Sequence, residues 1–427
     1  MTATTILHRE NPCYKRVANG IEVYQYDGET MPKKLVVPNE INGYPVVSIA
    51  EQFVVMENTI EEIVLPDSVE SIGDSAFNSC TKLKKIKLPY SLKKLGNFVF
   101  TNCPSLTNLT SNSSNFKVKS GAIYNKYTTT LLYAPAISQI TIPSTVKKIA
   151  QYSFYYNQNL KSVKIPSSVT TIEEGAFGDC PKLSQVKFSG TNLTKLGSFA
   201  FAYTPKIKEL LLPKSIKTVE DNAFVGHASD LKIYSKSSAV YNHCKKSKIS
   251  VSSADKISAS KYSAKLSTTS YTYNGKQKTP SVTIVDKANN KLVKNTDYTV
   301  SYSKNKYVGT GTLKVTFKGD YSGSKTLTFK INPASTTIKK LSPAKKSFTA
   351  TINKKSSQVT GYQIQYSTSK KFTNAKTKTI KSYKTTKITI KSLSAKKTYY
   401  VRVRTYKKVG SKTYYSAWSS YKYTKTK

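Results

Sequence analysis

The stretch that decides the fold is residues 63–85, IVLPDSVESIGDSAFNSCTKLKK, and it begins again at Ile86 as IKLPYSLKKLGNFVFTNCPSLTN. The two copies place proline, phenylalanine and cysteine at matching positions, 23 residues apart. Further copies begin at Ile140, Val163 and Val186. Self-similarity at a fixed period of this length is the signature of a chain built from stacked repeats.

Each repeat contains one short strand and one inward turn. The strand alternates, with Ile63 and Leu65 on one face, and Pro66 ends it because proline cannot donate to a ladder. The pair Ala76-Phe77 then turns inward. One unit of this size cannot bury its own apolar side chains, so stacked copies must build a continuous core.

The wider pattern resembles a known repeat family. The spacing Leu83-x-x-Ile86-x-Leu88 fits the leucine-rich repeat template, although Pro-x-Ser follows where that template has Asn or Cys. The fuller pattern I-x-[IL]-P-x-[ST]-[VLI]-x-x-[IL]-G/E-x-x-A-F-x-x-C-x-x-L resembles the BspA-type leucine-rich repeat of bacteria, over about half of the chain. The resemblance implies a solenoid fold and adhesion-type roles.

The solenoid is expected to have a cap and two irregular repeats. Residues 1–29 are predicted to form an N-terminal cap with a hairpin beside Asn19-Gly20, and residues 30–247 to form about eight repeats. The first repeat carries an insertion at residues 42–45. The stretch between Leu109 and Ile140 resembles the longer, hairpin-bearing repeat of the same family.

The composition changes after the repeats. Residues 248–265 are rich in Ser, Ala and Lys and are interpreted as a linker. In residues 266–333, short alternating segments separated by Gly, Asn and Lys predict a small β-sandwich. Its segments YNG, DYTVSY, GTG and GDYSG resemble the immunoglobulin-like modules of bacterial surface proteins.

Residues 334–427 predict a second sandwich, because their strands alternate cleanly. Tyr399, six residues after Leu393, resembles the tyrosine corner of a fibronectin type III domain, and Ser416-Ala-Trp418-Ser419 is expected in its last strand. Phe348 stands near the position of the tryptophan usual in that family. The expected fold class is mainly β, a leucine-rich-repeat solenoid followed by two β-sandwich domains.

The chain is strongly basic, with a formal net charge of +45 at pH 7. Residues 246–427 hold 40 of the 68 Lys and Arg residues and four of the 23 Asp and Glu residues, so they carry +36 and the first 245 residues carry +9. The arginines are Arg9, Arg16, Arg402 and Arg404. Because lysine is a hydrated point charge, this composition predicts either diffuse attraction to polyanions or a surface that keeps strand edges unpaired.

Residues able to perform catalysis or bind a metal are few. The sequence has no H-E-x-x-H, C-x-x-C or G-x-S-x-G motif. Its histidines are His8, His227 and His243. His243 precedes Cys244, but side chains adjacent in sequence usually point apart, and no third group accompanies them. We therefore expect no enzyme activity, no cofactor and no metal.

The cysteines are expected to be buried free thiols. Cys80, Cys103 and Cys180 occupy the same repeat position, while Cys13 and Cys244 lie in the two caps. An odd number of cysteines at repeat positions does not form a disulfide framework. A free cysteine behaves as a small apolar core residue.

The outward strand positions are the candidate ligand-binding surface. If the repeat strands line one concave sheet, alternate side chains point away from the core. The candidate residues are Lys85, Lys87, Gln139, Thr141, Lys164, Gln185, Lys187 and Glu209. This face is polar, mixed and mildly basic, and the alternative is a solvated face without a partner.

The predicted function is non-catalytic binding or adhesion, extracellular or at the cell surface, with the concave face presented to the ligand. Expected partners are a protein or glycan ligand of a host matrix, mucosa or cell wall, with polyanions as a further class and no nucleic acid. The alternative is a lysine-rich structural module that anchors the protein to polyanions or the cell wall, with the solenoid as a spacer. A third possibility is the accessory part of an enzyme whose catalytic domain lies outside this chain.

No run of 18 apolar residues is present, so no membrane span is expected. Residues 1–16 lack the charged and apolar blocks of a signal peptide. The sequence is therefore expected to be a mature form or a fragment, or to be exported by another route.

Overall fold

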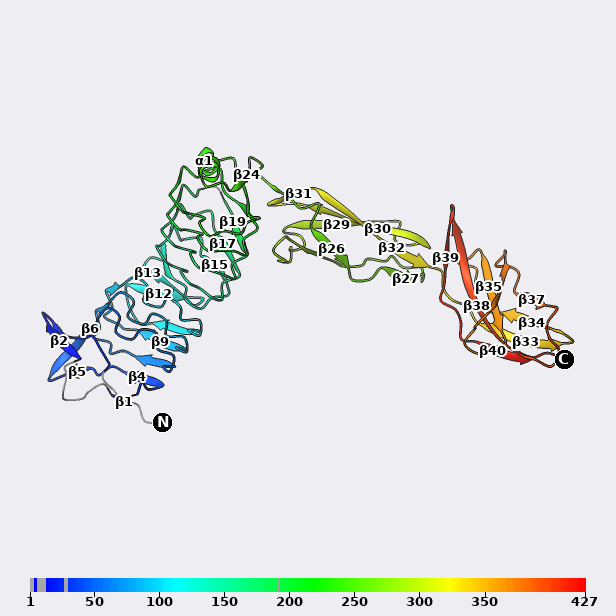
Figure 1. Cartoon of the computed structure of the whole chain (residues 1–427), viewed down its shortest axis with the longest axis horizontal. Helices are drawn as coiled ribbons and strands as arrows, with labels where there is room; N and C mark the ends of the chain where they lie inside the picture. The colour runs from blue at the N-terminus through cyan, green and yellow to red at the C-terminus, as the bar shows by residue number, and fades with distance from the viewer. Residues whose placement is uncertain (1–3, 6–12, 27–29, 191) are drawn as a thin grey trace. The chain divides into compact units, whose positions relative to one another are not determined.

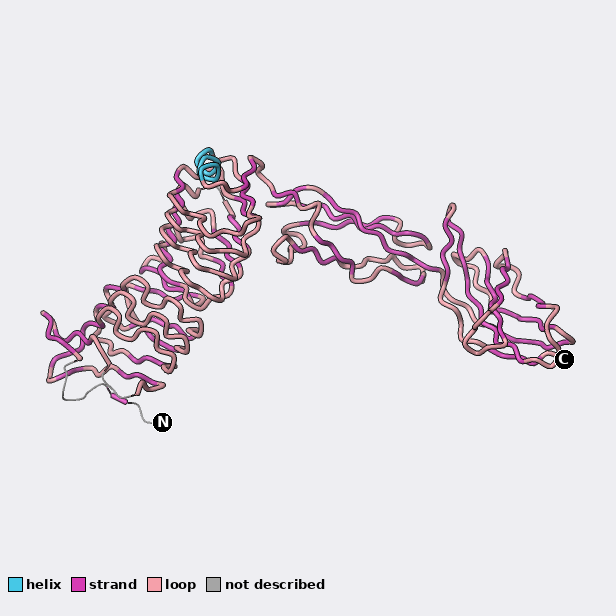
Figure 2. Tube along the Cα trace, viewed as in Figure 1, coloured by secondary structure: helices cyan, strands magenta, loops and turns pink. Residues whose placement is uncertain are grey.

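The computed structural model describes residues 4–5, 13–26, 30–190 and 192–427, so His8, Arg9 and Asp27-Gly28 lie outside the described residues. The chain divides into two compact units (Figure 1). Unit 1 comprises residues 1–257 with 287–290, and unit 2 comprises residues 258–286 with 291–427. Short strands dominate both units, and a helix closes the repeats (Figure 2).

Unit 1 is a stack of repeats whose first strands pair in parallel, in register, with the corresponding strands of the next repeat. These strands form three sheets. The first contains β1 (Thr4–Thr5), β4 (Lys34–Val36), β7 (Glu62–Val64), β9 (Lys85–Leu88) and β11 (Asn108–Ser111). The second contains β15 (Gln139–Thr141), β17 (Ser162–Ile165) and β19 (Gln185–Phe188). The third contains β21 (Glu209–Leu211), β23 (Lys232–Tyr234) and β24 (Ser250–Ser252).

The return side of each repeat carries a second, shorter strand. Six strands form one sheet here, namely β2 (Tyr14–Val17), β3 (Gly20–Val23), β5 (Glu40–Ile41), β6 (Tyr44–Ile49), β8 (Ser71–Ile72) and β10 (Lys94–Leu95). Seven form another, namely β12 (Phe116–Lys119), β13 (Ala122–Asn125), β14 (Thr130–Tyr133), β16 (Lys148–Ile149), β18 (Thr171–Ile172), β20 (Lys195–Leu196) and β22 (Thr218–Val219). Each repeat thus contributes one strand to either side of the core.

The core of the stack is a row of phenylalanine rings. Phe154, Phe177, Phe201 and Phe224 are almost completely buried and stack with ring centroids 4.8, 5.2 and 6.0 Å apart. These distances are close to the 4.7–4.9 Å spacing of neighbouring strands, so ring stack and sheet advance together. The inward turn that the sequence predicted at each Ala-Phe pair is confirmed.

The predicted irregular repeats are also confirmed. The hairpin beside Asn19-Gly20 is formed by β2 and β3. The insertion at residues 42–45 forms the turn between β5 and β6, where Asn42 and Gly43 have positive φ angles of 53° and 78°, as a type I′ turn requires. In the long repeat, β12 and β13 form the second hairpin, and β13 sends Ile123 into one core cluster and Tyr124 into the next.

Helix α1 (Ser238–Lys246) closes the stack and was not predicted. The Ser237 hydroxyl accepts a hydrogen bond from the Val240 N–H and caps its first turn. Val240, His243 and Cys244 form its buried face. The helix covers the last core ring, since His243 meets Phe224 edge-on at 5.8 Å.

The segment interpreted as a linker, residues 248–265, differs from that expectation. Its residues 250–252 form β24, the last strand of the solenoid, with Ile233 opposite Val251. Ile257, Ala259 and Tyr262 are buried. A few apolar side chains spaced among serines were enough to pack this segment, although its composition is typical of a loop.

Residues 258–286 and 291–332 form a sandwich in unit 2, whose strands pair antiparallel except for the parallel pair β27–β32. One sheet contains β27 (Ser270–Thr272), β29 (Tyr298–Ser303), β30 (Gly309–Phe317) and β32 (Ser324–Asn332), and another pairs β26 (Ser263–Leu266) with β28 (Val282–Val285). Two short strands, β25 (Ile257–Ser258) and β31 (Tyr321–Ser322), complete this region. Ile284, Leu313 and Val315 are fully buried between the sheets.

The last sandwich has two antiparallel sheets. One contains β33 (Ile338–Ala344), β34 (Ser347–Ile352) and β37 (Lys387–Ile390), and the other contains β35 (Gly361–Ser367), β36 (Lys376–Ile380), β38 (Thr398–Val409), β39 (Lys412–Tyr415) and β40 (Lys422–Lys425). Phe348 is buried and meets the Tyr366 ring edge-on, as expected for its core position. The Tyr399 hydroxyl accepts a hydrogen bond from the Ser394 N–H, which is the predicted tyrosine corner.

The expectation that residues 416–419 form part of the last strand is wrong. These residues lie between β39 and β40 and run beside β38. The Ser416 and Ser419 hydroxyls accept hydrogen bonds from the Thr405 and Val403 N–H groups. Serine hydroxyl groups thus accept the hydrogen bonds that backbone carbonyl groups of a paired strand would otherwise accept. The alternation of apolar residues in the sequence does not reveal this. The predicted fold class, mainly β with a repeat solenoid followed by sandwiches, is confirmed.

The ring stack makes a stability prediction. We expect Phe177→Ala to lower the free energy of unfolding by about 3–5 kcal/mol, because it opens a cavity between the Phe154 and Phe201 rings. Denaturant unfolding of the variant measures this loss. The control is Tyr127→Ala, since Tyr127 is 72% exposed and its removal should change stability little. A loss below about 1 kcal/mol for Phe177→Ala would contradict the inward register.

The cysteines make a reactivity prediction. All five are buried and outside any disulfide, and burial raises the pKa of Cys80 and of Cys180 to about 12. Since the thiolate is the reactive form, native protein at pH 8 should react with a thiol reagent only as fast as it unfolds. The rate of thiol labelling, measured in native buffer and at increasing denaturant concentration, tests this prediction. Labelling of Cys80 or Cys103 within seconds in native buffer would refute the prediction.

Candidate functional site

The outward side chains of the parallel strands form rows along the stack, because the strands pair in register. We call this surface the strand face, and define it by the outward residues of β4, β7, β9, β11, β15, β17, β19 and β21. In the first sheet, Lys34, Glu62 and Lys85 stand in one row, and Lys87 pairs with Thr110 in the next. The strand face therefore consists of short rows of aligned side chains.

Lys85 belongs to a charge-compensated row. The Glu62 carboxylate lies 2.8 Å from the Lys85 ammonium and 3.5 Å from that of Lys34. Hydrogen bonding from Lys85 lowers the pKa of Glu62 below its ordinary value, with further contributions from both ammonium charges. Lys85 thus pairs with a neighbouring repeat, although it is exposed like Lys87 on the same strand.

The second sheet brings five candidates together. Gln139 and Gln185 flank Ser162 in one row, and Thr141, Lys164 and Lys187 form the next. The sequence supplies no acidic residue in either row. Lys164 and Lys187 stand opposite each other in the second of these rows.

Gln185 adds a further polar group to this sheet. Its Nε2 atom is buried, and the described residues offer it no hydrogen-bond partner. A buried donor without a partner is rare and costs free energy, so it needs an explanation such as a bound water or ligand. This atom distinguishes Gln185 from the other candidates.

Glu209 differs from the rest of the set. It lies on β21 in the third sheet, and its side chain is only 7% exposed. The Tyr234 hydroxyl donates a hydrogen bond to it at 2.9 Å. Burial, together with this carboxylate, raises the pKa of Tyr234. Glu209 therefore holds neighbouring repeats together more than it faces a ligand.

The expectation of one continuous sheet is wrong, because the strand face is divided into three. The 31 residues from Leu109 to Ile140 insert the second hairpin, and β11 does not pair with β15. The repeat from Val186 to Leu210 is one residue longer than 23, and β19 does not pair with β21. The candidate residues thus divide into two on the first sheet, five on the second and one on the third.

Ion pairs between repeats neutralise many acids of unit 1. Lys84–Glu61, Lys85–Glu62 and Lys93–Glu70 have separations of 2.7, 2.8 and 2.7 Å. In each pair the two residues are 23 positions apart in the sequence. The charge pattern therefore follows the repeat as closely as the core does.

The histidine and cysteine side chains form no catalytic constellation in the described part of the chain. His243 and Cys244 are both buried in α1, and burial lowers the pKa of His243 and raises that of Cys244 to about 11. The His227 ring nitrogen lies 2.7 Å from the Ala228 carbonyl oxygen. Among the described residues, no three His, Cys, Asp or Glu side chains gather as a metal site.

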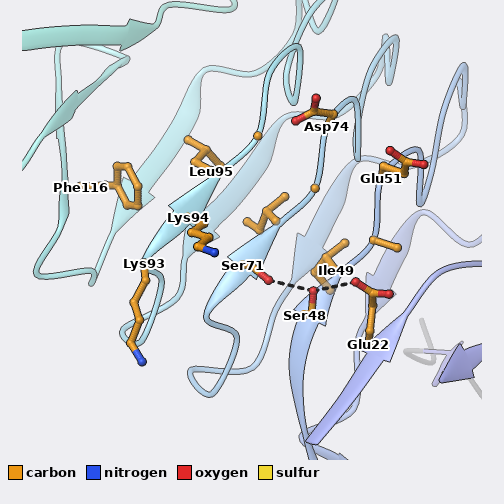
Figure 3. A pocket seen from close by; sticks show the side chains of 14 residues that line it. Glu22, Ser48, Ile49, Glu51, Ser71, Asp74, Lys93, Lys94, Leu95 and Phe116 are labelled. Carbon is orange, nitrogen blue, oxygen red and sulfur yellow. Dashed lines mark hydrogen bonds between the residues drawn. The ribbon is translucent and has the colours of Figure 1, made fainter. Parts of the chain in front are cut away.

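A hollow of about 600 Å³ lies on the return side of the first repeats (Figure 3). Figure 3 shows Glu22, Ser48 and Ser71 joined by hydrogen bonds across β3, β6 and β8, with Lys93 and Lys94 beside them. Two of its charged groups have partners in neighbouring strands or repeats, since Glu22 pairs with Lys15 at 2.6 Å and Lys93 with Glu70. The hollow is thus a junction between repeats and offers no distinct chemistry.

The arginines of the last sandwich are stacked between aromatic rings. Arg402 lies 4.0 Å from the Phe372 ring centre and 5.0 Å from that of Trp418, and Arg404 lies 4.3 Å from Trp418. Arg404 also faces the Tyr415 ring at 4.0 Å. These cation–π contacts hold the two arginines on the sheet, so the lysines supply the diffuse positive charge of this domain.

Sequence reasoning missed a group of aromatic side chains on the turns of unit 1. Tyr152 and Tyr155 belong to it, and each stands 23 residues before a glycine, namely Gly175 and Gly178. That spacing is visible in the sequence as soon as the repeats are aligned. A single repeat taken alone does not reveal it, because each ring and its glycine lie in neighbouring copies.

Two family models match the chain. The model described as "BspA type Leucine rich repeat region (6 copies)" matches residues 48–135 and 130–244, and "Fibronectin type III domain" matches residues 332–421. The chain therefore holds a BspA-type leucine-rich repeat region and a fibronectin type III domain, as both resemblances predicted. The immunoglobulin-like resemblance of residues 266–333 lies outside these matches and stays a prediction. No curated protein matches the chain.

Several solved structures are similar to parts of this chain. A leucine rich cell surface protein from Faecalibacterium prausnitzii A2-165 is 18% identical over 58% of this chain and 95% of that one, with a TM-score of 0.39. The pneumococcal vaccine antigen PcpA is 19% identical over 58% and 87%, with a TM-score of 0.35. A leucine-rich repeat protein from Bacteroides ovatus ATCC 8483 is 22% identical over 56% and 64%, with a TM-score of 0.36. In the described part of this chain, no helix is long and apolar enough to cross a membrane.

The compensated row makes a prediction about pH. Because the folded pKa of Glu62 is lowered, its contribution to stability is full above its ordinary value of 4.5 and is lost as the pH falls through the folded value. A double-mutant cycle of Glu62→Gln and Lys85→Gln should give a coupling of about 0.2–1 kcal/mol at pH 7 and low salt, as for exposed pairs. Unfolding of the four proteins at pH 7 and pH 3 measures it, and an equal coupling at both values would contradict the ion pair.

Proposed function

We propose that this protein is a non-catalytic binding protein, extracellular or at the cell surface, whose strand face binds an acidic protein ligand. The observation that carries the proposal is that Lys87 and Lys164 occupy outward positions of the strand face, in rows that hold no acidic residue. Positive charges on such a surface favour a partner of complementary, negative charge.

The neighbouring groups support the same surface. Lys87 and Lys164 are both exposed. Leucine-rich repeats and fibronectin type III domains are typically binding modules without catalysis. We also propose the domain boundaries, with the solenoid at residues 30–247 and the two sandwiches at residues 266–333 and 334–427.

The alternative function is anchoring to polyanions or cell-wall polymers through the lysine-rich second half. It is favoured by the +36 charge of residues 246–427 and by the absence of any Asp or Glu after Asp320. Such binding would come from counterion release and screened attraction, so it would weaken steeply with salt. It needs no particular geometry on the strand face.

A charge reversal separates the two functions. We expect the full chain with Lys87→Glu, Lys164→Glu and Lys187→Glu to lose binding to an acidic matrix protein such as fibrinogen by at least about tenfold. The matched control reverses Lys147, Lys206 and Lys217, which are exposed and lie away from the strand face, and it should bind as the wild type does.

Binding is measured by surface plasmon resonance at 50 mM and 300 mM salt, with heparin as the second ligand. If both variants bind fibrinogen and heparin equally, and all binding falls steeply with salt, the strand face is not the site and the anchoring function replaces it. Thermal unfolding confirms that both variants keep the fold.

A further inference from the structure

Except for the hairpin-bearing repeat, each repeat makes two left-handed turns beside its core phenylalanine. In the second repeat, they fall at Ser75 and Ser79, with φ angles of 56° and 60°, and in the last they fall at Asn222 and Gly226, with 58° and 67°. Glycine and asparagine tolerate this conformation, whereas bulky side chains strain it. Each of these repeats therefore contains two positions at which the left-handed backbone conformation favours small residues.

Five of these positions hold aromatic residues instead. They are Phe98, Tyr152, Tyr156, Phe199 and Tyr203, with φ angles of 57°, 57°, 58°, 56° and 52°. Hydrogen bonds to the next repeat keep them there, since the Tyr156 N–H donates to Gly178 at 3.0 Å and the Tyr203 N–H donates to Val225 at 2.8 Å. Backbone strain that a structure maintains in this way concentrates at binding sites.

The tyrosine rings are accommodated by glycines in the following repeat. A Cβ atom on Gly175 would come within 2.6 Å of the Tyr152 ring, and one on Gly178 within 3.1 Å of the Tyr155 ring. Tyr203 covers Gly226 in the same way. In all three pairs the ring and the glycine are 23 residues apart, so this arrangement recurs with the repeat. We call the aromatic residues on these turns the aromatic edge, and define it as Phe98, Tyr152, Tyr155, Tyr156, Phe199 and Tyr203.

This edge borders an open hollow of about 570 Å³. The second hairpin replaces the usual turn between the third and fifth repeats, so Phe98 contacts Tyr152 at 4.3 Å and Tyr155 at 5.8 Å between ring centres. The lining residues of the hollow are Met56, Asn58, Asn78, Ser79, Thr81, Thr101, Asn102, Tyr155 and Tyr156. They come from the turns of four repeats and lie apart from the strand face.

The chemistry of the hollow is neutral. Its lining holds no charged residue, although the chain carries +45. Amide and hydroxyl groups are chained along it, with the Asn102 amide donating to Ser79 at 3.2 Å and the Ser79 hydroxyl donating to Asn78 at 2.8 Å. Two tyrosine rings and the exposed Met56 side chain add apolar surface.

We propose that this hollow binds a neutral oligosaccharide. The C–H faces of a sugar ring carry slight positive charge and pack on the negative faces of aromatic rings, while its hydroxyl groups exchange hydrogen bonds with amides and hydroxyls. An anionic polymer finds no cation in the lining to compensate its charge. The site is distinct from the strand face, so it holds whether or not that surface binds a protein.

Tyr156→Asn tests the proposal with the full chain. Asn102 and Asp179 occupy the matching position in other repeats, so asparagine fits the left-handed turn and should leave the melting temperature unchanged or raise it. Affinity for the sugar should fall by about tenfold, because the ring face is lost. Tyr90→Asn is the matched control, since Tyr90 is 65% exposed on the same unit and outside the lining.

The probes are chitotetraose, cellotetraose and lacto-N-tetraose, measured by isothermal titration calorimetry at 50 mM and 500 mM salt. The expected result is binding of at least one probe that does not change with salt and that only Tyr156→Asn weakens. The proposal is overturned if the wild type binds none of the three at millimolar concentration, or if Tyr156→Asn binds as tightly as Tyr90→Asn. It is equally overturned if Tyr156→Asn weakens binding to fibrinogen while no probe binds, because the edge would then serve a protein.

Discussion

The structure of unit 1 depends on the match between ring stacking and strand pairing. Parallel strands advance by about 4.8 Å per repeat, and the phenylalanine rings stack 4.8–6.0 Å apart with interplanar angles of 15°, 5° and 4°. A repeat of 23 residues returns its ring to the same axis. Strand register, turn hydrogen bonds and ion pairs then recur at the same interval, because all of them connect equivalent positions of adjacent repeats.

Where a repeat carries an insertion of several residues, this match fails and the surface changes with it, whereas the repeat that is one residue longer than 23 keeps Phe177 and Phe201 stacked. At the hairpin-bearing repeat, Phe100 meets Tyr133 edge-on at 90° instead of stacking, and Phe53 meets Phe77 at 82° beside the first insertion. The first-strand sheet stops at the hairpin as well. The same interruption removes one turn and lets Phe98 reach Tyr152, so the neutral hollow and the break of the strand face between β11 and β15 have one cause.

Much of the fold could be predicted from the sequence because a repeated pattern samples the same environment several times. The inward rings, the buried thiols and the first hairpin followed from register and turn residues, and the second hairpin followed from the resemblance to the hairpin-bearing repeat of the family. The division of the strand face could not, since pairing across β11 and β15 depends on the path of an inserted hairpin. The ion pair of Lys85 and the burial of Glu209 could not be predicted either. The alternation of apolar and polar residues along a strand predicts which way a side chain points, but it does not predict which group the side chain contacts. The candidate residues themselves stay a prediction.

Lysine and arginine play different physical roles in this chain, and the net charge does not distinguish these roles. In unit 1, cross-repeat pairs such as Lys84–Glu61 absorb much of the positive charge, so contacts there depend on geometry. In the last sandwich, Arg402 and Arg404 are held between aromatic rings, and the remaining positive charge sits on lysines. The attraction exerted by an exposed lysine is screened by salt, whereas paired charges and the neutral groups of the hollow depend much less on ionic strength. Contacts of unit 1 and contacts of unit 2 should therefore respond differently to ionic strength, so ligand binding by the repeats and polyanion anchoring by the sandwiches need not exclude each other.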